Sequence, residues 1–367
     1  MKVKVIGAGS IGNHLSQAAR RMGWDVSVVD RDQEALRRMK EDIFPSRYGA
    51  WDEKIQLFDS ANEPKGGFDV ICIGTPPDVR LHLALQALEE KPKVLLLEKP
   101  LFTPDFAERE EFADFMNQVT KPISPTTVLA GYDHAVSAAI DFVSEMLRES
   151  SIGEVQTLDV EFRENWEGIF KAHRWLKGPA DSYLGFTARG GGASGEHSHA
   201  LHLFNHLALE AGLGQVVMVT PFLKMEEPPT GGKYDSIACF NLTTASGVIG
   251  RVVQDVVTKP TRKWVRLQGS KGFIEWICNG HTEGDLVRFQ TFGSPEVKEK
   301  VFAKRRQDDF FQEMLHIQKV IETRAAVGNG GSAWRSPVSL ESGLLVMEIL
   351  QAARRSDENQ HLPAFQF

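Results

Sequence analysis

The chain opens with MKVKVIGAGSIG, residues 1–12, and this stretch decides the fold of the first domain. Residues 2–6 are β-prone, glycines follow at once, and a helical pattern then continues through Met22. A strand, a tight turn and a helix in this order are typical of an α/β domain built on a parallel sheet.

Three glycines in this turn, Gly7, Gly9 and Gly12, have the spacing of a dinucleotide-binding loop. The first allows the tight turn, the second lets the backbone approach the pyrophosphate, and the third lets the helix pack closely on the strand. The helix N-terminus offers N–H groups to the phosphates. We therefore expect this loop, including Ser10 and Ile11, to bind the cofactor.

An acidic residue follows the next expected strand. Residues 25–29 form this strand, and Asp30 lies 18 residues beyond Gly12, where a ribose-binding acid is expected. Its carboxylate can accept hydrogen bonds from ribose hydroxyls and would repel a 2′-phosphate, which favours NAD over NADP. Arg31 is either solvent-exposed or able to pair with a 2′-phosphate, so NADP stays the less favoured alternative.

Two further apolar runs, residues 68–74 and 94–97, predict buried parallel strands. The first is followed by Thr75-Pro76 and a helix that carries His82. The second leads into Glu98-Lys99-Pro100. Because ligands of open α/β sheets bind at the carboxyl ends of the strands, these residues are candidate site residues.

Length and composition predict two domains and exclude several classes of protein. The 367 residues exceed one ordinary hydrophobic core, and we expect a Rossmann domain over residues 1–122 and an α+β domain over 123–367. The net charge of -7 disfavours a nucleic-acid partner. The three cysteines form no CxxC pair, and no apolar stretch is long enough to cross a membrane. A cytoplasmic location is expected.

The second domain alternates apolar and polar residues with the period of two that predicts a sheet with unlike faces. The expected strands are 157–162, 236–242, 248–256 and 264–268.

A glycine-rich run leads into a helix with several histidines, over residues 190–206. His199, His202 and His206 fall on one side of this helix, opposite an apolar side. His202 and His206 have the spacing of helical zinc ligands, but no further ligand is evident and we expect no metal. Both could instead form a solvated polar face.

These motifs together resemble the glucose-fructose oxidoreductase and inositol dehydrogenase (Gfo/Idh/MocA) family. The resemblance rests on the glycine loop, Thr75-Pro76, His82 and Glu98-Lys99-Pro100, and it extends to Ile152-Gly153-Glu154-Val155 and Gly269-Ser270-Lys271-Gly272. It implies a large, open, mostly antiparallel sheet in the second domain that also builds a homodimer or homotetramer interface.

The resemblance also assigns roles to individual residues. Thr75, Pro76, His82 and Glu98 would contact the cofactor, and Lys99 would take part in proton transfer. His199 matches the family's active-site histidine. The family has an aspartate four residues before this histidine, where this chain has Gly195, and Glu196 is the nearest acid. His202 stands where a second aspartate often follows.

A loop of aromatic and cationic residues lies between a strand and the glycine run. Trp166 and Trp175 could cover the apolar side of a sugar ring, and Arg174 could pair with an anionic group. An ordinary surface loop is the alternative.

The expected reaction is hydride transfer between NAD and a secondary alcohol of a sugar, sugar derivative or cyclitol. Lys99 would be the proton acceptor, with Glu196, His199 and His202 at the substrate. Two alternatives remain: a glycosidase that uses NAD transiently, and a non-catalytic sensor of dinucleotides.

The role of Asp30 yields a first prediction. Asp30→Ala should weaken NAD binding by about 1.5–3 kcal/mol, the usual scale for a hydrogen bond to a charged group. Titration with NAD and with NADP measures this effect. Tighter binding of NADP than of NAD by the native protein would contradict the proposed role.

Overall fold

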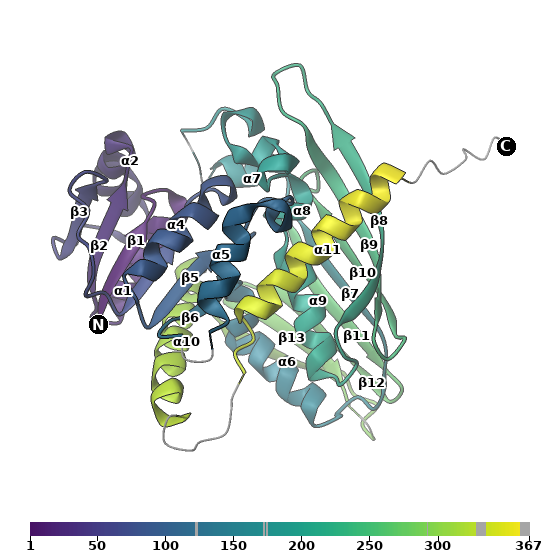
Figure 1. Ribbon diagram of the computed structural model, residues 1–367. Coiled ribbons are helices and arrows are strands. Elements are labelled where there is room, and N and C mark those ends of the chain that lie inside the picture. The colour runs from purple at the N-terminus through teal and green to yellow at the C-terminus, as the bar shows by residue number, and fades with distance from the viewer. Residues whose placement is uncertain (122–123, 172, 174, 292, 328–334, 360–367) are drawn as a thin grey trace. The chain divides into compact units, whose positions relative to one another are not determined.

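The computed structural model describes residues 1–121, 124–171, 173, 175–291, 293–327 and 335–359 (Figure 1). The chain forms two compact units. The first contains Met1–Ser137 and Lys304–Gly343, and the second contains Ala138–Ala303 and the chain from Leu344. The boundary expected between residues 122 and 123 lies outside the described residues.

A six-stranded parallel sheet organises the first unit. Its strands are arranged in the order β3-β2-β1-β4-β5-β6, and all neighbouring pairs are parallel. Successive strands are added on one side of β1 as far as β3, and on its other side from β4 onward. The strands are β1 (Lys2–Ile6), β2 (Asp25–Asp30), β3 (Ile55–Asp59), β4 (Val70–Ile73), β5 (Val94–Glu98) and β6 (Thr127–Gly131). This is the predicted Rossmann topology.

The first unit contains the helices that join the strands of this sheet, and also η3 and α10, which follow later in the chain. They are α1 (Ser10–Arg21), α2 (Gln33–Arg38), the π-helical turn η1 (Met39–Ile43), α3 (Phe44–Tyr48), α4 (Pro77–Glu89), η2 (Phe106–Glu108), α5 (Glu110–Val119), η3 (Asp133–Val136) and α10 (Arg306–Val327). Among the described residues, no helix is long and apolar enough to cross a membrane.

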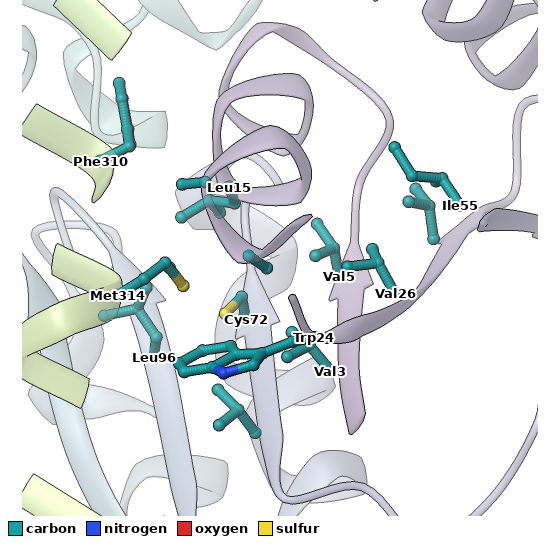
Figure 2. Close-up of a cluster of buried hydrophobic side chains, with 14 of the residues drawn as sticks. Val3, Val5, Leu15, Trp24, Val26, Ile55, Cys72, Leu96, Phe310 and Met314 are labelled. Atoms are coloured by element: carbon teal, nitrogen blue, oxygen red, sulfur yellow. The ribbon is translucent and has the colours of Figure 1, made fainter. Parts of the chain in front are cut away.

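The core of the first unit is closed by a helix from late in the chain. Phe310 and Met314 of α10 pack with Leu15 of α1 and with the strand residues Cys72 and Leu96 (Figure 2). Burial of such apolar side chains contributes about 1.5–3 kcal/mol each. The helix α10 is therefore an integral part of the nucleotide-binding unit.

An eight-stranded sheet organises the second unit, in the order β14-β13-β12-β11-β7-β10-β9-β8. Only the β7–β10 pair is parallel. The strands are β7 (Val155–Arg163), β8 (Val216–Glu226), β9 (Tyr234–Thr244), β10 (Ile249–Asp255), β11 (Arg262–Gly269), β12 (Gly272–His281), β13 (Gly284–Gln290) and β14 (Lys298–Ala303). The predicted large, mostly antiparallel sheet is confirmed.

One face of this sheet is covered by helices. Leu158, Val160 and Phe162 of β7 are fully buried on it, and α9 packs against β7 and β10. The remaining elements are α6 (Ala138–Arg148), α7 (Trp166–Lys171), η4 (Pro179–Asp181), η5 (Tyr183–Gly185), η6 (Thr187–Arg189), α8 (Gly192–Glu196), α9 (His199–Glu210) and α11 (Leu340–Asn359), which begins in the first unit and continues into the second.

Candidate active site

The glycine loop brings α1 against the end of β1. Gly7 has a φ of +109°, and its N–H donates to the Val29 carbonyl at 2.8 Å. A Cβ on Gly12 would lie 1.8 Å from the Gly7 carbonyl oxygen. No side chain fits there, so Gly12 fixes how closely α1 approaches the strand.

The second glycine leaves space for a ligand. Gly9 is the N-cap of α1 and offers no side-chain cap, and a Cβ built on it would meet no protein atom within 4 Å. The first N–H groups of the helix, at Ser10 and Ile11, have no acceptor within the helix. This cradle fits a dinucleotide pyrophosphate, because a phosphate can approach the bare backbone and accept these bonds.

Asp30 ends β2 beside this loop. One carboxylate oxygen accepts the Ala8 N–H at 2.7 Å, and the other accepts the Asp32 N–H at 2.9 Å. A carboxylate has about four acceptor positions, so capacity remains for ribose hydroxyls. The same contacts hold the loop in shape. Arg31 is exposed.

The carboxyl ends of β4 and β5 are joined by a buried arginine that the sequence analysis missed. Arg80 of α4 is 2% exposed, and its guanidinium donates to the carbonyls of Thr75, Glu98 and Pro100. Pro76 is the N-cap of the same helix. An arginine in a helix is normally exposed to solvent. The local sequence therefore did not indicate that Arg80 is buried and joins the two strand ends.

Glu98 and Lys99 stand at this edge of the sheet. The Glu98 side chain is buried against Gly131 of β6, where a Cβ would lie 2.8 Å from the carboxyl carbon. Burial, and then the charge of Asp133, raise the pKa of Glu98 to about 7. Lys99 follows directly and is half-buried.

Two more buried carboxyl groups lie near Glu98. Asp133 of η3 and Glu313 of α10 are 3% and 1% exposed. Burial and the charges of Glu98 and Asp133 raise the pKa of Glu313 well above its usual range. Local sequence did not mark Glu313 as a residue of this cluster, because α10 is distant along the chain from β5.

His82 lies on an exposed part of α4. Its side chain is 62% exposed on α4, and its Nδ1 lies 3.3 Å from the Glu111 carboxylate of α5. A cofactor contact by His82 stays a prediction.

The glycine-rich and histidine-rich segment of the second unit forms the helices α8 and α9, which are joined by a short link. Glu196 is the last residue of α8, and His199 is the first residue of α9. The His199 ring lies parallel to Phe162 of β7, with centroids 6.1 Å apart. Both Glu196 and His199 are half-buried. The two predicted residues therefore stand on either side of one helix junction.

The expected solvated face of this helix is wrong. His202 and His206 are 1% and 8% exposed. His206 Nε2 lies 3.1 Å from the Ser144 hydroxyl of α6, and burial lowers the pKa of His206 to about 4. His206 is a neutral residue that joins two helices. A substrate contact by His202 stays a prediction.

The aromatic loop is partly packed. Trp166 stacks on Phe170 and meets Tyr234 edge-on, inside a small apolar cluster with Ile169 and Leu184. The Trp175 ring lies 5.4 Å from His173. Arg174 lies outside the described residues.

The comparison with protein families identifies the first domain. Residues 1–126 match the model of the Gfo/Idh/MocA oxidoreductase family, described as having an NAD-binding Rossmann fold. Residues 1–126 are thus similar to the NAD-binding domain of this family. The predicted family, oxidoreductase class and NAD cofactor are confirmed. A comparison with curated protein sequences finds no match.

Solved structures share the fold of this chain over nearly its whole length. An oxidoreductase from Agrobacterium radiobacter in complex with NAD+, L-tartaric acid and magnesium has 18% identity and a TM-score of 0.70, covering 98% of this chain and 96% of its own. An aldose-aldose oxidoreductase from Caulobacter crescentus complexed with glycerol has 18% identity and a TM-score of 0.71, covering 98% and 97%.

A third similar structure is the WlbA dehydrogenase from Bordetella pertussis in complex with NADH and UDP-GlcNAcA. It has 16% identity and a TM-score of 0.66, and it covers 98% of this chain and 96% of its own. At such low identity these likenesses establish the fold alone.

The glycine loop provides a prediction with an internal control. Gly9→Ala should leave the free energy of unfolding nearly unchanged but weaken NAD binding, because its methyl group would project into the space for the pyrophosphate. Gly12→Ala should lower both, since its methyl group would clash with the Gly7 carbonyl. Denaturant unfolding and NAD titration separate the two variants. Equal loss of stability in both would show that Gly9 is required by the protein itself.

Proposed function

We propose that this chain is an NAD-dependent dehydrogenase that transfers a hydride between a secondary alcohol of a sugar, sugar derivative or cyclitol and the nicotinamide. One observation carries the proposal. The glycine loop, Asp30 and Lys99 all follow the carboxyl ends of one parallel sheet, in a domain of an NAD-binding oxidoreductase family. In such sheets ligands bind at this edge.

The roles at this edge follow from the groups available. The Ser10 and Ile11 N–H groups would hold the pyrophosphate, and Asp30 would accept the ribose hydroxyls. Thr75, Pro76 and Glu98 would line the cofactor site beyond the switch point between β1 and β4. When bound, NAD supplies the ring that accepts or returns a hydride.

Lys99 is the proposed proton acceptor. Oxidation of an alcohol releases a proton from the hydroxyl as the hydride leaves, and an uncharged amine at Nζ can take that proton. Glu196, His199 and His202 of the second unit would bind or orient the substrate. The solved WlbA dehydrogenase complex with NADH and UDP-GlcNAcA, and a levoglucosan dehydrogenase complex with NADH, support a sugar-like substrate class.

The proposed role of Lys99 is tested by its removal. Lys99→Met should lower kcat by about 10²- to 10⁴-fold, the range that a positioned base contributes, with NAD affinity and Tm nearly unchanged. Lys93→Met is the matched control, because Lys93 directly precedes the N-terminal end of β5, opposite to the proposed site, and its side chain is 58% exposed. His199→Ala should reduce turnover by less if it only orients the substrate.

The measurement is steady-state kinetics on a substrate found by screening sugars, sugar phosphates, uronic acids and cyclitols for NADH formation. Near-native turnover by Lys99→Met would remove Lys99 from the mechanism. Glycoside cleavage without net NADH would favour the glycosidase alternative. NAD binding without turnover of any compound would favour the sensor.

We also propose a homo-oligomer formed through the exposed face of the eight-stranded sheet. A ladder of alternating charges crosses this face. Arg251 pairs with Asp159 at 2.7 Å, and further along the sheet Glu275 pairs with Arg266 at 3.2 Å and Arg288 at 3.1 Å.

A largely apolar row runs beside the charge ladder, two residues along each strand. Glu161 of β7 and Cys239 of β9 lie in this row. Its apolar members are Phe222, Val253, Trp264, Ile277, Leu286 and Val301. Phe222 is 63% exposed. Apolar and charged rows side by side on an open face are typical of a protein interface.

Phe222→Glu should therefore shift the protein toward the monomer, because a charge would be buried at the interface. Val79→Glu is the control, since Val79 is an exposed apolar residue of α4 in the first unit. Size-exclusion chromatography with light scattering measures the mass of each. A native protein that is monomeric at all concentrations, or a Phe222→Glu variant with unchanged mass, would contradict the proposal.

Cytoplasmic location and the lack of a nucleic-acid partner stay predictions from composition.

A further inference from the structure

A fully buried carboxylate fastens the glycine segment of the second unit to the sheet. Asp235 lies on β9 and is 0% exposed. It accepts the Ser194 N–H at 2.6 Å, the Ser194 hydroxyl at 3.0 Å and the Thr187 hydroxyl at 2.9 Å. The Asp235 N–H in turn donates to the Thr187 hydroxyl oxygen at 3.1 Å. One side chain thus holds both the turn before α8 and α8 itself.

The bond to Ser194 is a helix cap supplied from a distant strand. The N-cap of α8 is Gly191, which has no side chain to cap the helix. Ser194 is the third residue of α8, and its N–H is one of the groups that a cap normally satisfies. Asp235 provides the acceptor instead. Its negative charge at a helix N-terminus also interacts favourably with the helix dipole.

The glycines of the segment make room for this carboxylate. Gly192 has a φ of +81°, and a Cβ there would lie 2.1 Å from an Asp235 carboxylate oxygen. A Cβ on Gly191 would lie 2.1 Å from the Tyr183 carbonyl oxygen. Gly192 is therefore required by the close approach of Asp235, and Gly191 by the close approach of the chain at Tyr183.

The fastened helix leads directly to the proposed substrate residues. Glu196 ends α8, only His197 and Ser198 intervene, and His199 begins α9. The junction is held a second time by Gln254 of β10, which is fully buried and donates to the His197 carbonyl. Two neighbouring strands, β9 and β10, thus hold the backbone that carries Glu196 and His199.

The charge on Asp235 is costly to the fold. Burial raises its pKa from the ordinary 3.8 to about 6, although the Ser194 and Thr187 bonds oppose this shift. Between these two values the folded state binds more protons than the unfolded chain, so stability falls as the pH rises through this window. Above about pH 6 the full cost of ionisation is present.

We propose that Asp235 is a positioning residue of the substrate site, which fixes Glu196 and His199 by fastening the glycine segment to β9. This inference rests on the proposed function for its kinetic consequence. The fastening itself is a property of the second unit and can be measured without substrate.

The decisive variant is Asp235→Asn, which keeps the shape of the side chain. Its amide group would turn a donor toward the Ser194 and Thr187 donors, so these bonds cannot all persist. Asp285→Asn is the matched control, because Asp285 is another fully buried aspartate of this unit. It accepts the Trp276 indole N–H at 3.0 Å and the Asn279 N–H at 2.9 Å.

Asp235→Asn should lower kcat by about 10- to 100-fold, the scale of a small misplacement of reacting groups. NAD affinity should stay unchanged, and kcat is expressed per folded protein, because the lost hydrogen bonds also lower the free energy of unfolding. Asp285→Asn should keep native kcat in its folded fraction. Loss of turnover in parallel with loss of folded protein in Asp235→Asn, or an equal kcat loss in Asp285→Asn, would overturn the proposal.

Hydrogen exchange of residues 187–205 gives a readout independent of the reaction. Exchange in this segment should be faster in Asp235→Asn than in native protein and unchanged in Asp285→Asn. Ser194→Ala, which removes one hydroxyl donor, should show a smaller effect of the same direction if Asp235→Asn does not fold. Unchanged exchange in the folded variants would overturn the proposal. If exchange is faster in Asp235→Asn but the native protein turns over no substrate, the structural role of Asp235 is supported and only the proposed function is rejected.

Discussion

The contact between Gly12 and the Gly7 carbonyl is the constraint on which the first unit depends. With no Cβ at Gly12, α1 can lie against the end of β1 and direct its N-terminus along the carboxyl edge of the sheet. The Asp30 carboxylate then reaches the Ala8 N–H and ties the end of β2 to the same loop. Arg80 does the equivalent for β4 and β5. The site at the sheet edge is thus held by backbone groups of four strands.

The second unit solves a similar problem with a different device. A helix N-terminus must be placed accurately, and again glycines allow the approach. In the first unit the helix packs against the end of a strand. In the second unit the helix is held instead by the carboxylate of Asp235. In both units an aspartate on a strand accepts a backbone N–H of a glycine-rich segment.

Local sequence was sufficient where a structural requirement is met within a few residues. The turn at Gly7, the start of α1 and the acid at Asp30 follow from steric and chemical needs of one βαβ unit. Each predicted strand is present, whereas β3, β6, β8, β12, β13 and β14 were not predicted. Arg80, Asp235 and Glu313 could not be predicted in the same way, because their partners lie on elements far along the chain. The burial of His202 and His206 was missed for a related reason. A polar side of a helix indicates solvent unless other parts of the fold cover it, and Ser144 of α6 shows that such covering occurs at His206.

The position of α10 in the chain has a consequence for biosynthesis. This helix supplies Phe310 and Met314 to the core under the parallel sheet, yet it follows the whole eight-stranded sheet in the sequence. Domains usually fold as units, the N-terminal one first, as the chain leaves the ribosome. Here the nucleotide-binding core cannot close until the ribosome has completed the sheet of the other unit. The emerging chain must keep residues 1–137 in an unfinished state during that interval, with the apolar surface that α10 later covers open to chaperones.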